Sequence, residues 1–110
     1  MNDIYSVIYS PEATEDLREI YYYIAVTIKV SSTAKAQIER IRKVIRSLDF
    51  MPFRNVLVKR EPWKSLNMYR VIIDNFVVFY TVDEISLKVC IIRIVYGGRD
   101  LISLSFNKTE

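Results

Sequence analysis

The last third of the chain contains three runs of β-branched and aromatic residues separated by polar positions. The runs cover residues 68–73, 76–82 and 87–96. This composition is typical of strands. Asp74 and Asn75 lie between the first two runs, and both residue types tolerate the positive φ that a two-residue hairpin turn requires. A looser turn at 83–86 precedes the third run, so the pattern predicts three consecutive antiparallel strands.

The first part of the chain predicts a strand followed by a helix. Residues 4–9 alternate well enough for a strand. Ser10-Pro11-Glu12 then has the capping serine, the first-turn proline and the acidic residue of a helix start. Apolar side chains follow at spacings of three and four, which puts them on one helix face. We expect this face to pack on the sheet, and it comprises Ala13, Leu17, Ile20, Ile24 and Ile28.

A second helix is predicted after Ser31-Ser32-Thr33, which can cap it. Its apolar stripe consists of Ile38, Ile41, Ile45 and Leu48. Pro52 ends the helical region, and residues 54–65 form a loop or an irregular edge strand. The expected fold is therefore α+β, in the order β-α-α-β-β-β with a short final helix after Asp100, and a helical hairpin packs on an antiparallel sheet.

Length and cysteine usage restrict the class of protein. A chain of 110 residues can build one core, so we expect a single domain spanning residues 1–110. No stretch approaches the roughly 18 uncharged apolar residues of a membrane span. The start lacks the basic region and long apolar run of a secretory signal, and Cys90 has no second cysteine to pair with. We therefore expect a cytoplasmic protein with no membrane contact.

The residue types present also exclude several kinds of chemistry. The chain has no histidine, which removes the commonest metal ligand and the commonest general base. We accordingly expect no metal site and no cofactor. Cys90 has no histidine to activate it as a nucleophile, so packing explains it better. Tyr21, Tyr22 and Tyr23 point about 100° apart on a helix and cannot form one platform for stacked bases.

Positive charge gathers just before the predicted hairpin. The formal net charge of the chain is only +3. The segment 54–70 nevertheless contains Arg54, Lys59, Arg60, Lys64 and Arg70 against the single acid Glu61. Such a stretch attracts polyanions and acidic protein segments, although an ordinary solvated face would have the same composition.

The third predicted strand runs directly into Gly97-Gly98-Arg99-Asp100. These are the only two glycines in the chain, and they allow the backbone to bend or to approach a ligand closely. The arrangement holds the Arg99 cation at a sheet end, while a plain turn is the alternative interpretation.

The order strand, helix, helix and three strands, closed by Tyr96-Gly97-Gly98-Arg99-Asp100, resembles the RelE/ParE superfamily of bacterial toxin-antitoxin toxins. The likeness covers nearly the whole chain, including Ser10-Pro11-Glu12-Ala13 and Leu48-Phe50-Pro52. The resemblance implies a compact toxin that is neutralised by an antitoxin encoded beside it. Two modes of growth inhibition are known for such folds, namely ribosome-dependent cleavage of messenger RNA and poisoning of DNA gyrase.

The resemblance also implies roles for particular residues. The RNA-cleaving branch places two arginines around the scissile phosphate, and Arg70 and Arg99 match them as catalytic residues. Lys59, Arg60 and Lys64 fall on the loop where that branch has its lysines. Together with Tyr96, these three residues are expected to bind nucleic acid or another target. Arginine suits the phosphate because its planar fork donates two parallel hydrogen bonds and stays charged.

The general base is left open by the sequence. The RNA-cleaving branch often has a tyrosine a turn and a half beyond the final arginine, but this chain has Ser105 there, followed by Phe106. Glu61, Tyr69 and Tyr96 are the candidates to replace it. A tyrosine has an ordinary pKa near 10, so it is a poor base at neutral pH unless neighbouring cations lower that pKa.

Three functions therefore stay open. The first is a metal-independent endoribonuclease whose partners are the ribosome and messenger RNA. The second is a gyrase poison without nuclease activity, and the third is a non-toxic interaction module, which would need no cationic pocket. In each case the antitoxin is expected to present an amphipathic or acidic segment, which docks as a helix in a groove or as an added strand.

Overall fold

The computed structural model describes residues 4–97, which form a five-stranded sheet with two long helices on one face. The elements follow in the order β1 (Ser6–Tyr9), α1 (Pro11–Tyr22), a π-helical turn (Tyr23–Thr27), α2 (Ser31–Arg46), two 3-10 turns (Ser47–Asp49 and Pro52–Arg54), β2 (Val56–Leu57), β3 (Met68–Ile73), β4 (Phe76–Asp83) and β5 (Lys88–Tyr96). The expected α+β class is confirmed, as is the order of the predicted helices and strands. The additional short strand β2 lies in the segment 54–65, which was expected to be a loop or an irregular edge strand, and it forms an edge of the sheet. The predicted helix after Asp100 lies outside the described residues.

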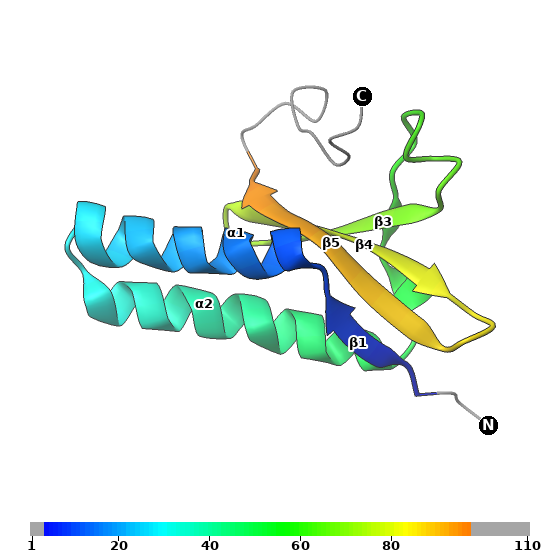
Figure 1. The fold of residues 1–110 in the computed structure, drawn as a ribbon, viewed down its shortest axis with the longest axis horizontal. Coiled ribbons are helices and arrows are strands. Elements are labelled where there is room, and N and C mark those ends of the chain that lie inside the picture. The colour runs from blue at the N-terminus through cyan, green and yellow to red at the C-terminus, as the bar shows by residue number, and fades with distance from the viewer. Residues whose placement is uncertain (1–3, 98–110) are drawn as a thin grey trace.

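The sheet has the strand order β1-β5-β4-β3-β2 (Figure 1). β1 pairs in parallel with β5, whereas β2, β3, β4 and β5 form a continuous antiparallel series. A register shift between Phe79 and Tyr80 interrupts the pairing of β4 with β5. Because β1 pairs with β5 only as far as Ile91, the last residues of β5 have no neighbouring strand on that side among the described residues.

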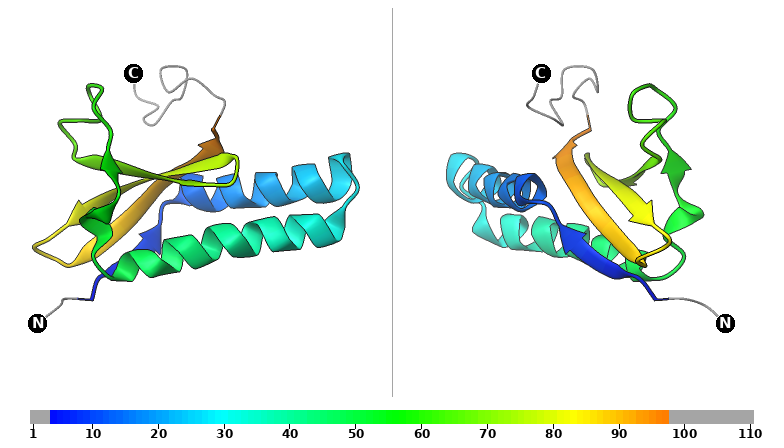
Figure 2. Two further views of the ribbon diagram at one scale, coloured as in Figure 1. Left: turned by 180° about the vertical axis from the view of Figure 1, so that it is seen from behind. Right: turned by 45° about the vertical axis from the view of Figure 1, so that its right-hand side comes forward.

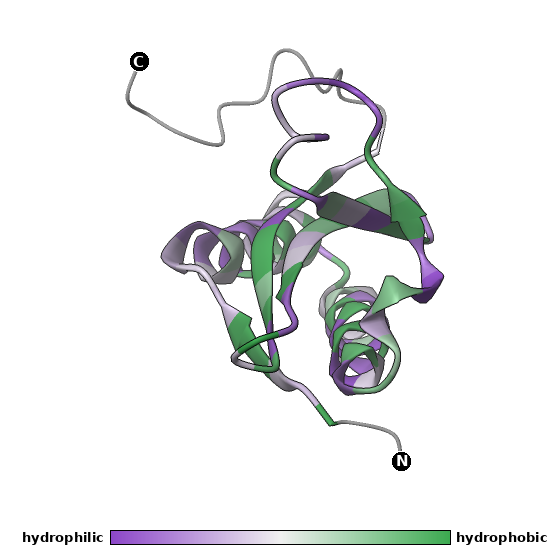
Figure 3. Ribbon diagram, turned by 90° about the vertical axis from the view of Figure 1, so that its right-hand side faces the viewer, coloured by the Kyte–Doolittle hydropathy of each residue, from purple (hydrophilic) through white to green (hydrophobic). Residues whose placement is uncertain are grey.

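Each face of the sheet has its own apolar cluster. The helices cover one face, where the fully buried Ile41, Ile45 and Val78 belong to the larger core. On the opposite face, Val58 and Trp63 from the segment between β2 and β3 pack with Phe79 in a smaller cluster. Figure 3 shows the helices on one face of the sheet and a mainly polar loop on the other.

The two helices begin in different ways. The hydroxyl of Ser10 accepts a hydrogen bond from the backbone N–H of Ala13 at 2.9 Å, which confirms the predicted cap of α1. The prediction that Ser31-Ser32-Thr33 would cap α2 was wrong. Ser31 is already helical, and Val30 occupies the cap position without any side-chain hydrogen bond. Packing of the buried stripe on α2 thus replaces the cap as the source of its stability.

The end of the helical hairpin at which α1 connects to α2 extends beyond the sheet (Figures 1 and 2). This geometry corrects the expected apolar stripe of the first helix. Ala13 and Leu17 are buried on the sheet, but α1 gives way to the π-helical turn after Tyr22, and Ile28 is half exposed. The end of the predicted stripe therefore lines a groove instead of a closed core.

The turn between β3 and β4 is attached to both α2 and β5. Asp74 adopts a φ of +56°, as expected for this turn. Its carboxylate accepts hydrogen bonds from Gln37 at 2.9 Å and from Arg40 at 2.7 Å. The Gly97 N–H donates to the carbonyl of Asn75 at 2.7 Å, and a Cβ added at Gly97 would lie 3.1 Å from that oxygen. The close approach that Gly97 permits is thus to the chain itself.

Tyr80 connects the main core to the segment that precedes β2. Its side chain is fully buried, and its hydroxyl donates to the carbonyl of Pro52 at 2.7 Å while accepting from the Asn55 amide at 3.0 Å. Burial raises the pKa of this hydroxyl above its ordinary value. The phenol therefore stays protonated and able to donate at neutral pH.

Replacing Tyr80 with phenylalanine is expected to lower the free energy of unfolding by about 1–3 kcal/mol, because the buried Pro52 carbonyl and the partly buried Asn55 amide each lose a partner. Equilibrium urea unfolding measures the change. Tyr22→Phe is the matched control, because Tyr22 is 60% exposed. Equal stability of both variants would show that the Tyr80 hydroxyl does not hold this segment.

Candidate functional site: a basic groove on the open sheet face

A groove of about 450 Å³ lies on the sheet face opposite the helices. We call it the basic groove, and its described lining residues are Val56, Leu57, Val58, Lys59, Arg60, Arg70, Val77, Phe79, Val95, Tyr96 and Gly97. The lining thus comes from β2, the segment that follows it, β3, β4 and the end of β5. It brings together four of the residues predicted from the sequence to be functional, namely Lys59, Arg60, Arg70 and Tyr96.

Strand register places Arg70 in this groove. Arg70 pairs with Phe79 on one side and with Val56 on the other. Directly paired residues share a face, and Phe79 belongs to the apolar cluster opposite the helices. Arg70 is partly buried, and its guanidinium makes no hydrogen bond or ion pair with any residue of 4–97. A cation held over an apolar floor is available for an anionic ligand.

Lys59 and Arg60 reach the same groove from the segment after β2. Val58 anchors this segment, because its side chain is buried and its N–H donates to the carbonyl of Met68 at 2.8 Å. The next two side chains are exposed and line the groove beside Arg70. Three cations therefore surround one hollow, whereas the described lining contains no carboxylate.

Two predicted site residues are not placed in the groove. Lys64 lies on the turn between β2 and β3, where its N–H donates to the carbonyl of Arg60, and it is absent from the groove lining. Arg99 lies outside the described residues. The predicted convergence of Arg70 and Arg99 on one phosphate consequently stays a prediction.

The candidates for a general base separate by position. Tyr69 precedes Arg70 in β3, so its side chain lies on the opposite face of the sheet. There it packs against the core beneath the helices, and its ring stacks on that of Tyr80 with centroids 5.5 Å apart. Burial, followed by the nearby Glu84, raises the pKa of Tyr69, which is the wrong direction for a base. Glu61 accepts hydrogen bonds from the backbone and hydroxyl of Ser65 and does not line the groove. Tyr96 alone of the three lines it.

A second, larger hollow of about 910 Å³ lies between the helical hairpin and the end of β5. We call it the apolar groove. Its described lining residues are Asp16, Glu19, Ile20, Tyr23, Ile24, Ile28, Val30, Thr33, Gln37, Asn75, Phe76, Arg93, Ile94, Val95 and Tyr96. Val95 and Tyr96 line both grooves, so the two hollows meet at the end of β5.

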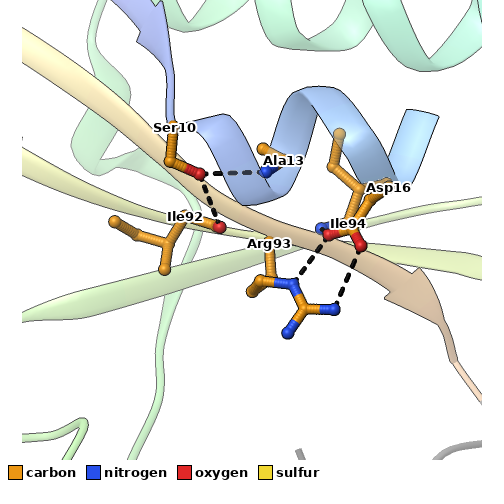
Figure 4. Close-up of polar contacts among 6 residues, drawn as sticks. All are labelled: Ser10, Ala13, Asp16, Ile92, Arg93 and Ile94. Carbon is orange, nitrogen blue, oxygen red and sulfur yellow. Dashed lines mark hydrogen bonds and ion pairs between the residues drawn. The ribbon is translucent and has the colours of Figure 1, made fainter. Parts of the chain in front are cut away.

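A polar network joins α1 to β5 beside this hollow (Figure 4). Asp16 accepts hydrogen bonds from Arg93 Nε at 2.8 Å, from a terminal guanidinium nitrogen of Arg93 at 3.0 Å, and from the Ile94 N–H at 2.9 Å. The Ser10 hydroxyl donates to the carbonyl of Ile92 at 2.9 Å. These contacts fix the direction in which β5 leaves the sheet toward Gly97.

The sequence interpretation did not single out Asp16 or Arg93 as a pair. A signal was present, because Asp16 lies on the apolar face of α1 between Ala13 and Leu17. A carboxylate on such a face needs a buried cationic or N–H partner. Its partner lies 77 positions away, so the sequence alone does not identify it.

Among residues 4–97, no helix is both long and apolar enough to cross a membrane. The same residues contain no cluster of three metal-ligating side chains of the histidine, cysteine, aspartate and glutamate types.

Comparisons with solved structures place this fold among toxin-antitoxin proteins. A chain of the chromosomal ParDE system from P. aeruginosa is similar, with a TM-score of 0.68 and 19% identity, covering 84% of this chain and 96% of that one. A chain of the archaeal RelE-RelB complex from Pyrococcus horikoshii OT3 gives a TM-score of 0.62 and 19% identity, covering 88% and 99% respectively. A chain of the RelBE2 complex from Mycobacterium tuberculosis gives a TM-score of 0.59 and 17% identity, covering 86% of this chain and 92% of that one.

At these identities the structures establish a shared fold. No curated protein sequence matches the chain. The family described as the ParE toxin of type II toxin-antitoxin systems, parDE, matches residues 7–101. Because this match extends over most of the sequence, from β1 through the last strand, the chain belongs to the ParE toxin family within the RelE/ParE superfamily.

Proposed function

We propose that this toxin inhibits growth by cleaving messenger RNA on the ribosome, using the basic groove to bind the phosphate backbone. The observation that carries the proposal is the meeting of Arg70, Lys59 and Arg60 around one hollow with an apolar floor. A low-dielectric floor strengthens the attraction between these cations and a phosphate. Tyr96 at the end of the groove supplies an aromatic ring and a hydroxyl.

The reaction needs few protein groups. The 2′-oxygen of one nucleotide attacks the adjacent phosphorus, and the bond from phosphorus to the 5′-oxygen breaks. A base takes the proton of the 2′-hydroxyl, and an acid protonates the departing 5′-oxygen, which leaves a 2′,3′-cyclic phosphate and a 5′-hydroxyl end. Arg70, with Arg99 as its expected partner, would stabilise the negative charge that develops on the phosphate. Tyr96 is the proton-transfer candidate that lines the groove.

The test is a translation system reconstituted on ribosomes programmed with a defined message. Wild-type toxin is expected to cut the message at discrete positions, leaving 5′-hydroxyl ends that primer extension maps, and to leave the same RNA whole when ribosomes are omitted. The Arg99→Ala variant is expected to lose cutting while remaining folded. Intact message in the presence of wild-type toxin and ribosomes would reject the proposal.

Poisoning of DNA gyrase is the second candidate. It is favoured by the absence of a carboxylate from the described lining of the basic groove, because a poison needs no acid-base chemistry of its own. Membership of the ParE family also supports it. Expression would then cause cleaved gyrase-DNA complexes and an SOS response to accumulate while messages stay whole. A protein inert in both assays that still binds its antitoxin would be an interaction module.

A further inference from the structure

The end of β5 contributes two residues to the basic groove but pairs with a strand on one side only. Tyr96 and Gly97 line the groove, and they come just before the segment that contains Arg99. β1 pairs with β5 only as far as Ile91, so beyond that point β4 is the one neighbouring strand within residues 4–97. The position of this side of the groove therefore depends on what holds the end of β5 to β4.

The turn between β3 and β4 makes the contacts that hold this end. The Gly97 N–H donates to the carbonyl of Asn75 at 2.7 Å. Tyr96 pairs with Phe76 in the strand register, and the two rings meet edge to face with centroids 6.0 Å apart. The turn and the end of β5 thus lie side by side (Figure 1). A displacement of the turn would consequently displace Tyr96 and Gly97 as well.

Two polar side chains of α2 hold this turn in place. The Asp74 carboxylate accepts, at the single oxygen Oδ2, from Gln37 Nε2 at 2.9 Å and from Arg40 Nε at 2.7 Å. A terminal nitrogen of Arg40 also donates to Gln37 Oε1 at 3.4 Å, which closes a triangle of contacts. Hydrogen bonding to Arg40, followed by that to Gln37, lowers the pKa of Asp74, so this carboxyl is ionised at neutral pH. Helix α2 is therefore connected to the end of β5 through the turn.

We propose that Asp74 is a positioning residue of this toxin, which through Gln37 and Arg40 ties the end of β5 to α2 and so holds Tyr96 in place in the basic groove. The inference rests on the proposed function for the part that Tyr96 plays in proton transfer. None of the three residues of the triangle belongs to the described lining of the basic groove, so they act on a bound message only through β5. Such action is effective, because a misplacement of about 1 Å can cost about 10²-fold in rate.

Hydrogen exchange of backbone amides, followed by NMR in the free full-length toxin, measures this connection without ribosomes or gyrase. Asp74→Gly removes the carboxylate but keeps a residue that readily adopts the φ of +56° found at this position. We expect the Gly97 amide to exchange about tenfold faster in this variant, because its hydrogen bond loses the support of the turn. The Ala13 amide, which bonds to the Ser10 hydroxyl at the start of α1, should keep its wild-type rate.

Three further variants show whether the effect passes through the ion pair. Arg40→Ala combined with Asp74→Gly should accelerate Gly97 little more than Asp74→Gly alone, because residues that act through one contact are not additive. Asp74→Asn keeps an acceptor oxygen and should restore most of the protection. Asp83→Gly is the matched control, since Asp83 ends β4 at its other end and accepts from the Ser86 N–H in its own turn.

The consequence for catalysis is measured as message cleavage on programmed ribosomes. Asp74→Gly should lower kcat by about 10- to 100-fold and leave KM within about twofold of the wild type, because the cations that bind the message are retained. Asp74→Asn should recover most of the lost kcat, and Asp83→Gly should cut as the wild type does. A purely structural role would move the urea unfolding midpoint without this separation of kcat from KM.

An unchanged Gly97 exchange rate in Asp74→Gly, or an equal acceleration at Gly97 and Ala13, would overturn the connection between α2 and β5. A wild-type kcat in Asp74→Gly would reject its role in positioning Tyr96. The exchange measurement keeps this inference separate from the proposed function. A wild-type toxin that cuts no message, but whose Gly97 amide responds to Asp74→Gly and not to Asp83→Gly, would uphold the connection and reject the proposed function.

Discussion

Replacing Asp16 with alanine is expected to destabilise the protein by about 3–5 kcal/mol, the cost of removing one partner from a buried ion pair. The Asp16 and Arg93 side chains retain only 10% and 18% of their accessible surface. Without the carboxylate, the Arg93 guanidinium loses two hydrogen bonds and the Ile94 N–H loses its acceptor. Since small domains have total stabilities of about 5–15 kcal/mol, the loss is a large fraction of the whole. Equilibrium urea unfolding followed by circular dichroism measures it.

Glu15→Ala is the matched control for this prediction. Glu15 lies one position earlier on α1 and pairs with Arg18 on the exposed side of the helix. Solvent screens that pair, so its loss should change the unfolding midpoint little. Asp16→Asn should fall between the two, because the amide keeps one acceptor oxygen for Ile94 but removes the charge that pairs with Arg93. Equal midpoints for Asp16→Ala and Glu15→Ala would show that the network does not hold β5 to α1.

Local chemistry explains why most of the elements were predictable. The runs rich in β-branched and aromatic residues between 68 and 96 became β3, β4 and β5, with β3 matching its predicted bounds of 68–73. The start of α1 was predictable because it depends on neighbouring residues alone: the Ser10 hydroxyl accepts a hydrogen bond from the Ala13 N–H, and Pro11 is the first helical residue. The start of α2 was predicted less accurately, because three consecutive hydroxyl residues offer several equivalent caps. The structure uses none of them as a cap.

The site was predictable only in part, because it depends on contacts between distant residues. The concentration of cations before β3 was visible in the sequence, but the face on which Arg70 lies is set by its pairing with Val56 and Phe79. A shift of one residue in that register would have turned the Arg70 side chain toward the helices. The placement of Lys64 away from the groove likewise follows from the turn between β2 and β3, whose path the composition does not specify.

Replacing Arg70 with alanine is expected to reduce toxin activity by roughly 10²–10³-fold, the usual effect of removing a donor that stabilises developing negative charge. Arg70 forms no hydrogen bond or ion pair within residues 4–97, so its removal should leave the unfolding midpoint close to that of the wild type. Message cleavage on programmed ribosomes measures the activity, and growth after induction measures its consequence. Arg70→Lys should retain intermediate activity, because lysine keeps the positive charge but cannot donate two parallel hydrogen bonds to one phosphate as a guanidinium does.

Arg42→Ala provides the control for this loss. Arg42 is an exposed arginine on α2, which covers the opposite face of the sheet, so the substitution removes the same charge and volume away from the basic groove. If Arg42→Ala weakened cleavage as much as Arg70→Ala, the effect would come from overall charge and the basic groove would have no special role. If both variants kept full toxicity while gyrase-DNA complexes accumulated, inhibition would depend on a surface other than the Arg70 cation. Retained folding with lost cutting for Arg70→Ala alone would instead connect this one guanidinium to the phosphate.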